Sequence, residues 1–265
     1  MGPEAAVIQF APTTDKTQSL ATIRNYISQA AQQGADVVVL PEYSTYAKPG
    51  LDASYIDTAE ALEGAAVTTL RQLSTEHNIV IIAGVHEPDG AGRMYNTLVA
   101  VRDGEIKATY RKIHLYDAFG MQESQWVTPG TIEEPTLLEI GGLKFGLQTC
   151  YDLRFPEVSR MLVDAGADVL VFPAAWVPGP LKESHWMTLL RARAIENTTY
   201  VLASDQAAPT GIGHSSIIDP MGVTVAMVGD DVGIARATLT KERIEATRTM
   251  NPALQLRRFT TQAKA

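Results

Sequence analysis

The sequence predicts an α/β protein: a four-layer α-β-β-α sandwich of two mixed sheets with helices on the outer faces. The main observation is an internal repeat. Residues 36–41 (DVVVLP) are nearly repeated as residues 168–173 (DVLVFP), and each run follows a helical pattern that ends at a glycine. Each half of the chain therefore contains a strand–helix–strand unit. Two such halves, packed sheet against sheet with their helices outside, give four layers.

The first half supplies the elements of one sheet. Short apolar runs predict strands, and apolar residues at helical spacing predict helices. Asp15 is a suitable cap for the first helix, and Asp103-Gly104 is a strong two-residue turn between the last two strands. The expected strands cover 5–10, 36–40, 79–85, 95–102 and 105–110, and the expected helices cover 15–33 and 65–76.

The second half repeats this order after a long polar and aromatic loop at 116–134, a length typical of functional loops. No low-complexity linker divides the chain, so a single domain is expected over 1–265, with a C-terminal arm from about 247 to 265. The expected strands cover 137–140, 143–149, 168–173, 200–204, 214–218, 223–228 and 233–238, and the expected helices cover 156–165 and 182–197.

Composition narrows the possible partners. The 22 basic and 30 acidic residues give a net charge of −8, which disfavours a general nucleic-acid binder. A single cysteine excludes an intramolecular disulfide and a multi-cysteine zinc site. No apolar run reaches the ~20 residues needed to span a bilayer, and the first ten residues lack a signal-like pattern. We therefore expect a cytoplasmic protein with no membrane partner.

The single cysteine, Cys150, lies between a predicted strand and a predicted helix start. Asp152 is a potential cap, Pro156 suits the first helical position and Glu157 suits the first turn. Such a cysteine is expected to be exposed at a sheet edge, near the positive end of a helix dipole. Both features favour the thiolate and hence a nucleophile.

A thiol nucleophile needs a base and a group that stabilises an oxyanion. Histidine is the usual partner, and among the five histidines His185 and His214 are the better placed, although their spacing selects neither. The alternative is Glu42 with Lys112. Each follows a strong strand, as Cys150 does, and groups beyond the carboxyl ends of strands converge on one crevice. These residues alone leave both possibilities open.

Three separated motifs decide between them: Leu-Pro-Glu at 40–42, Tyr-Arg-Lys-Ile-His-Leu at 110–115 and Cys-Tyr-Asp-Leu-Arg-Phe-Pro-Glu at 150–157. Together they resemble the nitrilase superfamily of carbon–nitrogen hydrolases, most closely its Nit-type ω-amidase branch. The resemblance covers nearly the whole chain. It implies a Glu42–Lys112–Cys150 triad with Glu123 as a second glutamate, a thioester intermediate, and no metal or organic cofactor.

The resemblance also implies a substrate class. Tyr151-Asp152 after the cysteine favours small linear amides, such as the ω-amide of a keto acid or deaminated glutathione, over nitriles. Aliphatic amides, carbamoyl amides and nitriles remain alternatives. The loop from Trp176 to Lys182 departs from the family pattern, although His185-Trp186 after it is kept, and this leaves the substrate open. The candidate substrate-binding residues are Tyr43, Tyr151, Trp176 and Lys182, with Lys182 suited to a substrate carboxylate.

Three further expectations concern structure and partners. Asp152 and Arg154 are expected to form an ion pair that shapes the turn after Cys150. The family usually dimerises, so a homodimer or higher homo-oligomer is expected, through apolar residues that could equally face the sheet: Phe155, Met161, Leu162, Trp186, Leu189 and Leu190. The competing function classes are a catalytically silent interaction protein on this fold and a Cys/His acyltransferase.

Overall fold

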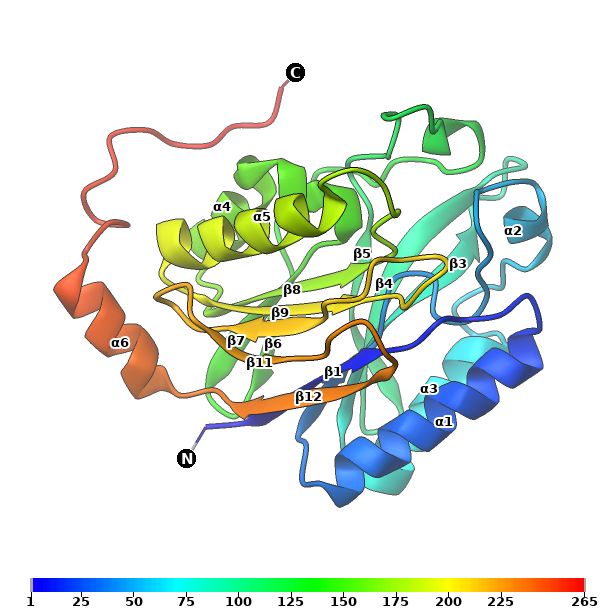
Figure 1. Cartoon of the computed structure of the whole chain (residues 1–265), viewed down its shortest axis with the longest axis horizontal. Helices are drawn as coiled ribbons and strands as arrows, with labels where there is room; N and C mark the ends of the chain where they lie inside the picture. The colour runs from blue at the N-terminus through cyan, green and yellow to red at the C-terminus, as the bar shows by residue number, and fades with distance from the viewer. Residues whose placement is uncertain (1, 265) are drawn as a thin grey trace.

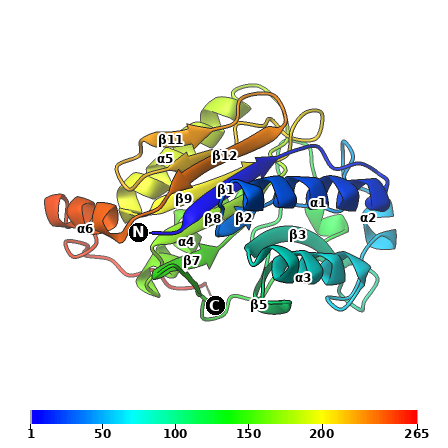
Figure 2. The same cartoon turned by 90° about the horizontal axis from the view of Figure 1, so that it is seen from below.

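The computed structural model describes residues 2–264 and contains two six-stranded sheets packed face to face (Figures 1 and 2). The first sheet has the order β12-β1-β2-β3-β4-β5 and the second the order β11-β10-β9-β8-β7-β6. Helices cover the outer face of each sheet. The predicted four-layer sandwich of two mixed sheets is therefore confirmed.

In the first sheet, β1, β2 and β3 run parallel, and β12, β4 and β5 each run antiparallel to their neighbours. Because β5 reverses the direction of β4, its carboxyl end lies at the same edge as those of β2 and β3. The strands are β1 (Glu4–Gln9), β2 (Val37–Val39), β3 (Val80–Pro88), β4 (Met94–Arg102), β5 (Glu105–Arg111) and β12 (Gly233–Thr238).

The second sheet repeats this plan. Its strands β7, β8 and β9 run parallel. Strand β6 is antiparallel to β7, strand β10 is antiparallel to β9, and β11 pairs with β10 at the edge of the sheet. The strands are β6 (Leu138–Ile140), β7 (Leu143–Leu147), β8 (Val169–Ala174), β9 (Tyr200–Asp205), β10 (Ser216–Ile218) and β11 (Thr224–Met227). The repeated motif identified in the sequence forms the corresponding strands β2 and β8.

Three apolar clusters separate the four layers. One fills the space between the sheets and includes Val7, Val39, Phe145 and Leu202. The second lies between the first sheet and helices α1 (Lys16–Gln32) and α3 (Ala65–His77), and the third between the second sheet and helices α4 (Pro156–Asp164) and α5 (Lys182–Asn197). Strands buried on both faces explain why the strand sequences are apolar runs without alternation.

Local signals account for the helix boundaries. The side chain of Asp15 accepts hydrogen bonds from the first backbone N–H groups of α1, as its capping role predicts. Pro156 occupies the first turn of α4. The sequence did not indicate the single-turn helix α2 (Ser54–Asp57) or the 3₁₀ turns η1 (Glu123–Gln125) and η2 (Cys150–Arg154), because elements this short carry no periodic pattern.

Helix α6 (Lys241–Met250) follows β12 and includes the first residues of the predicted C-terminal arm. Residues 251–264 form no helix or strand and run back towards α4, where Arg257 pairs with Asp164 (Figure 1). Of the six apolar residues considered for a dimer interface, Leu162, Trp186 and Leu190 are buried in the cluster beneath α4 and α5. The other three, Phe155, Met161 and Leu189, are partly buried.

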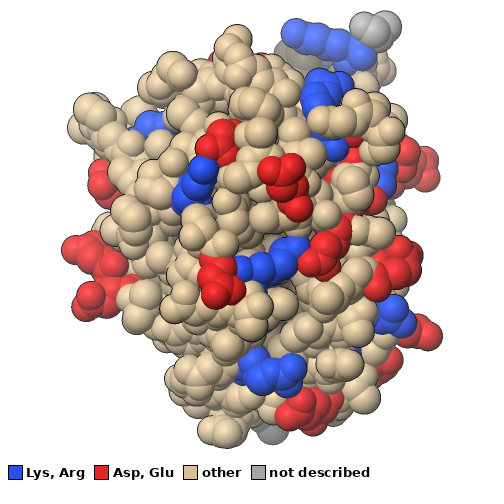
Figure 3. Space-filling model, turned by 90° about the vertical axis from the view of Figure 1, so that its right-hand side faces the viewer, with Lys and Arg blue, Asp and Glu red and all other residues tan. Residues whose placement is uncertain are grey.

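The distribution of surface charge and the lengths of the helices are relevant to the predictions about nucleic-acid and membrane partners. On the face shown in Figure 3, basic and acidic side chains are interspersed among uncharged groups. None of the helices formed by residues 2–264 is long and apolar enough to cross a bilayer.

Candidate active site

The candidate catalytic residues follow the carboxyl ends of strands from both sheets. Glu42 comes three residues after β2, Lys112 directly after β5, and Cys150 is the first residue of η2, which follows β7. Glu123 begins η1 in the long loop. Because these strand ends share one edge of the sandwich, side chains more than a hundred residues apart in the chain meet at one place.

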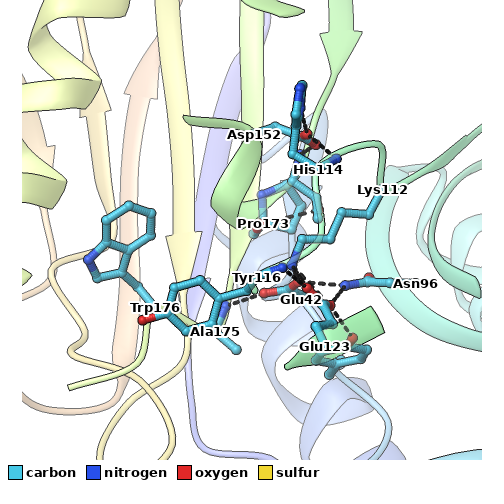
Figure 4. Close-up of polar contacts among 12 residues, drawn as sticks. Glu42, Asn96, Lys112, His114, Tyr116, Glu123, Asp152, Pro173, Ala175 and Trp176 are labelled. Atoms are coloured by element: carbon cyan, nitrogen blue, oxygen red, sulfur yellow. Dashed lines mark hydrogen bonds and ion pairs between the residues drawn. The ribbon is translucent and has the colours of Figure 1, made fainter. Parts of the chain in front are cut away.

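Lys112 lies at the centre of this group (Figure 4). Its Nζ donates to Oε1 of Glu42 at 2.9 Å and lies 2.9 Å from Oε2 and 3.1 Å from Oε1 of Glu123. The side chains of Lys112 and Glu42 are only 2% and 1% exposed. Two carboxylates thus share one buried ammonium group, and Cys150 lines the same cavity.

Neutral donors also bind both carboxylates. Asn96 Nδ2 donates to Oε1 of Glu42 at 2.6 Å, and the N–H of Ala175 donates to its Oε2 at 2.7 Å. Glu123 accepts from the Tyr43 hydroxyl at 2.8 Å and from the N–H of Tyr116 at 2.6 Å. These contacts come from both sheets and hold both carboxylates in fixed positions.

A close backbone approach behind Glu42 depends on a glycine. A Cβ placed on Gly84 of β3 would lie 2.7 Å from Cα of Glu42 and 2.7 Å from the backbone N of Tyr43. A larger residue there would displace the turn that carries Glu42.

The electrostatic environment overturns the prediction of an exposed, thiolate-favouring cysteine. Cys150 is only 7% exposed. Burial raises the pKa of its thiol well above the usual value, and the charge of Glu42 raises it further, whereas Lys112 acts in the opposite direction. The helix-start argument is local, and burial beside a carboxylate outweighs it. The resting residue is a thiol beside a carboxylate able to take its proton.

The pKa of Lys112 shifts in the opposite sense to that expected from burial. Burial alone would lower it, but the charges of Glu123 and Glu42 more than compensate and hold the pKa well above its usual value. Lys112 is therefore a permanent cation beside the thiol. A fixed cation in a site shielded from water is suited to stabilising a developing oxyanion.

A cavity of about 70 Å³ opens onto these groups. Of the four candidate substrate-binding residues, only Tyr43 lines it, and it does so together with Tyr116, Met121 and Val177. Tyr151, Trp176 and Lys182 lie beside this cavity, not on its wall.

Lys182 is one of a pair of cations, the other being Arg154, and Tyr151 and Trp176 lie beside this pair. Lys182 Nζ donates to the Tyr116 hydroxyl at 2.6 Å and lies 4.1 Å from the ring centre of Phe119. The guanidinium of Arg154 lies over the rings of Trp176, at 4.7 Å, and Phe119, at 5.4 Å. Both cations therefore contact the same aromatic surface. Burial lowers the pKa of Lys182, and the charge of Arg154 lowers it further.

Neither cation has an anionic partner among residues 2–264. Nη2 of Arg154 lies 3.5 Å from Nδ1 of His185, and its buried Nε has no hydrogen-bond partner. The predicted ion pair between Asp152 and Arg154 is therefore wrong. Asp152 turns the other way and contacts Tyr110 and His114, because the strand that carries Lys112 offers it several donors.

The structure does not bring a histidine to the cysteine. None of the five histidines lines the cavity; His185 lies near Arg154, and His214 pairs with Asp230 at 3.2 Å. Within the described residues, no cluster of three or more His, Cys, Asp and Glu side chains is arranged to hold a metal ion.

Sequence reasoning missed three groups that contact Glu42: Asn96, the backbone N–H of Ala175, and Gln206, whose side chain donates to the Glu42 carbonyl at 2.7 Å. Asn96 left a signal, as the lone amide in the apolar strand β4. The other two follow the carboxyl ends of β8 and β9, which is where the strand-end argument would have found them.

Comparison with known proteins shows which family the chain resembles. The family model described as carbon–nitrogen hydrolase matches residues 4–249. The chain is 43% identical over 252 residues to deaminated glutathione amidase of Escherichia coli O157:H7, covering 95% of each chain. It is 31% identical over 275 residues to omega-amidase NIT2 of Mus musculus, covering 98% of this chain and 97% of that one.

A solved structure of a mutant amidase from Nesterenkonia sp. AN1, with an acetamide moiety added covalently at its active-site cysteine, matches with a TM-score of 0.82 and 26% identity. The match covers 97% of this chain and 94% of that one. With a matching family model over nearly its whole length and close relatives from bacteria and mouse, the chain belongs to the carbon–nitrogen hydrolase family.

Proposed function

We propose that this protein is a cysteine-dependent amidase that cleaves a small linear amide bearing a remote carboxylate, through a thioester on Cys150. The observation that carries the proposal is the placement of the only cysteine in one cavity with Glu42 and Lys112, whose charged groups are 2.9 Å apart. A buried thiol, a carboxylate and a fixed cation are what nucleophilic attack on an amide requires.

In the acylation step, Glu42 takes the proton of Cys150 and the sulfur attacks the amide carbon. The oxyanion that forms lies against Lys112 and the N–H of Tyr151, which belongs to the first turn of η2, where N–H groups lack an acceptor within the helix. Glu42 then passes its proton to the leaving nitrogen. The C–N bond breaks, and ammonia or an amine leaves with that proton.

In the deacylation step, Glu42 takes a proton from a water molecule, and the resulting hydroxide attacks the thioester carbon. The C–S bond breaks, the carboxylic acid is released and Cys150 recovers its proton. Glu123 stays bound to Lys112 throughout and keeps the cation in place. Removing one donor from an oxyanion site typically costs about 10²–10³ in kcat.

The pair of cations supports an acidic substrate. Arg154 and Lys182 are partly or fully buried, lie on the same aromatic surface and lack a carboxylate partner among the described residues. Tyr116 joins them to the catalytic group, because its N–H binds Glu123 and its hydroxyl binds Lys182. A substrate whose amide lies at Cys150 would extend along Tyr116 and place its carboxylate between the two cations.

The names of the relatives agree with such a substrate. A deaminated glutathione amidase and an omega-amidase are among the most similar proteins. We propose an ω-amide of a keto acid or a deaminated-glutathione-like compound as the substrate, in preference to neutral aliphatic amides, carbamoyl amides or nitriles.

The test is ammonia or amine release over five classes of compound: keto-acid ω-amides, deaminated glutathione, neutral aliphatic amides, carbamoyl amino acids and nitriles. We expect turnover of the first two classes and none with Cys150→Ala. Amide hydrolysis retained in Cys150→Ala would contradict the mechanism. Absence of turnover across the whole panel would favour a silent interaction protein on this fold.

Two predictions from the sequence, the oligomeric state and the cellular location, remain proposals. We propose a homodimer or a higher homo-oligomer, which light scattering of the purified protein would test against a monomer. A cytoplasmic location also stays a prediction, and fractionation of cells that express the protein would test it.

A further inference from the structure

The carboxylate of Asp152 takes no part in the chemistry above, yet it is completely buried and contacts four polar groups. Its Oδ1 accepts from the N–H of His114 at 3.1 Å and lies 2.9 Å from Nδ1 of the same residue. Its Oδ2 accepts from the Tyr110 hydroxyl at 2.6 Å and from the N–H of Thr149 at 3.1 Å.

The positions of these donors in the chain are informative. Tyr110 lies two residues before Lys112, and His114 two residues after it. Thr149 immediately precedes Cys150, and Asp152 itself follows two residues later. The Asp152 carboxylate thus links the residues before and after Lys112 to the segment that contains Cys150. Figure 4 places Asp152 and His114 beside the chain that leads to Lys112.

The turn that Asp152 ties down is strained. Cys150 has a φ of 42°, in the left-handed region that side chains other than glycine seldom adopt. Such a conformation persists only where the surroundings impose it. Thr149 and Asp152 form a reciprocal capping box around this residue, so Asp152 belongs to the framework that imposes it.

We propose that Asp152 is a positioning residue, which fixes the strained Cys150 turn against the Lys112 segment and so sets the distance between the nucleophile and the cation. This inference rests on the proposed role of Cys150. Asp152 does not line the cavity, so it acts on the reacting groups and not on substrate binding. Its loss should therefore lower kcat and leave KM unchanged.

Asp152→Asn tests this with little change of shape. An amide retains one acceptor oxygen but turns an NH₂ group towards donors, so at least one of the ties to the Lys112 or Cys150 segment is lost. We expect kcat for the preferred amide to fall by about 10- to 100-fold, as small displacements of reacting groups do, with KM within twofold. Tyr110→Phe removes a single tie and should give a smaller loss in the same sense.

The matched control is Asp219→Asn. Asp219 is also buried and also accepts from two backbone N–H groups, those of Met221 and Val223, but in the turn before β11. We expect its kcat to equal that of the wild type once folding is verified by circular dichroism. A fall in kcat equal to that of Asp152→Asn would mean a general effect of lost buried carboxylates and would overturn the proposal.

Wild-type kcat in a folded Asp152→Asn protein, or a loss expressed only in KM, would also overturn it. If Asp152→Asn does not fold, Tyr110→Phe decides, and wild-type kcat there overturns the proposal. These failures are distinct from those of the proposed function, which fails if Cys150→Ala still hydrolyses amides or if the wild type turns over no compound of the panel.

Discussion

Two groups of buried charge lie on either side of Tyr116, and they are completed in opposite ways. Lys112 is neutralised by Glu42 and Glu123 within 3.1 Å. Among residues 2–264, the contacts of Lys182 and Arg154 are with aromatic rings, a hydroxyl and a histidine nitrogen. The first group thus has its counter-charges in the free protein, whereas the second has no anionic partner within that range.

In the function proposed above, the first group carries out the reaction and the second binds the substrate. Groups that carry a reaction need fixed positions and a stable charge state before the substrate arrives, and mutual ion pairs provide both. Groups that recognise a substrate gain most when the ligand brings the missing charge. Burial of like charges costs free energy in the unliganded protein, as expected where stability has been given up for function.

The largest expected effect comes from breaking the complete group at its base. Glu42→Gln leaves the shape of the side chain but removes the proton acceptor, so kcat should fall by about 10²–10⁴-fold. Glu245→Gln, an exposed change on α6, is the control and should leave kcat unaltered. A Glu42→Gln enzyme with wild-type kcat would show that another group accepts the thiol proton.

The same substitution in both groups compares their energetics directly. Lys112→Met leaves two carboxylates buried without their cation and should lower the free energy of unfolding by about 3–5 kcal/mol. Lys182→Met removes an unpaired cation beside Arg154, so its free energy of unfolding should stay within about 1 kcal/mol of the wild type or rise. Urea unfolding measures the free energy of unfolding of both variants. Equal decreases in the two variants would contradict the difference between the paired and the unpaired group.

The incomplete group is tested by the charge of the substrate. Arg154→Gln and Lys182→Met should each raise KM for a carboxylate-bearing amide by roughly 10- to 100-fold, since one charged hydrogen bond contributes about 1.5–3 kcal/mol. A neutral amide of the same length is the control, and its KM should not change. A similar loss for both substrates would place the cations outside the carboxylate site.

A smaller effect is expected in the titration of the thiol. Because the charge of Glu42 raises the pKa of Cys150 while Lys112 lowers it, Glu42→Gln should lower the thiol pKa. The rate of alkylation by iodoacetamide, followed against pH, should then rise at a lower pH in Glu42→Gln than in the wild type. With a single cysteine the readout belongs to one group. An upward shift would mean that Glu42 does not raise this pKa.

The sequence placed Glu42, Lys112 and Cys150 directly after predicted strands, and in the structure these strands end at one edge of the sandwich. Strand order alone did not choose them over a histidine; the resemblance of the three motifs to the nitrilase superfamily did. The fold was predictable because the strand–helix–strand unit occurs twice.

The features of the site that the sequence did not predict depend on side-chain contacts between residues far apart in the chain. Asp152 has Arg154 as a neighbour in the chain, but its side chain contacts Tyr110 and His114, on either side of Lys112, and the N–H of Thr149. The helix-start signal at Cys150 says nothing of the carboxylate that folding places beside it. The direction in which Asn96 points also depends on the register of β4 with β3 and β5.

The most direct test of cysteine-dependent amide cleavage is the mass of the enzyme during turnover. A keto-acid ω-amide is mixed with excess enzyme and quenched in acid within milliseconds, and the protein is analysed intact and after digestion. We predict an added acyl group on the peptide that contains Cys150, and no adduct with Cys150→Ala. Turnover without any adduct, together with an active Cys150→Ala enzyme, would contradict it.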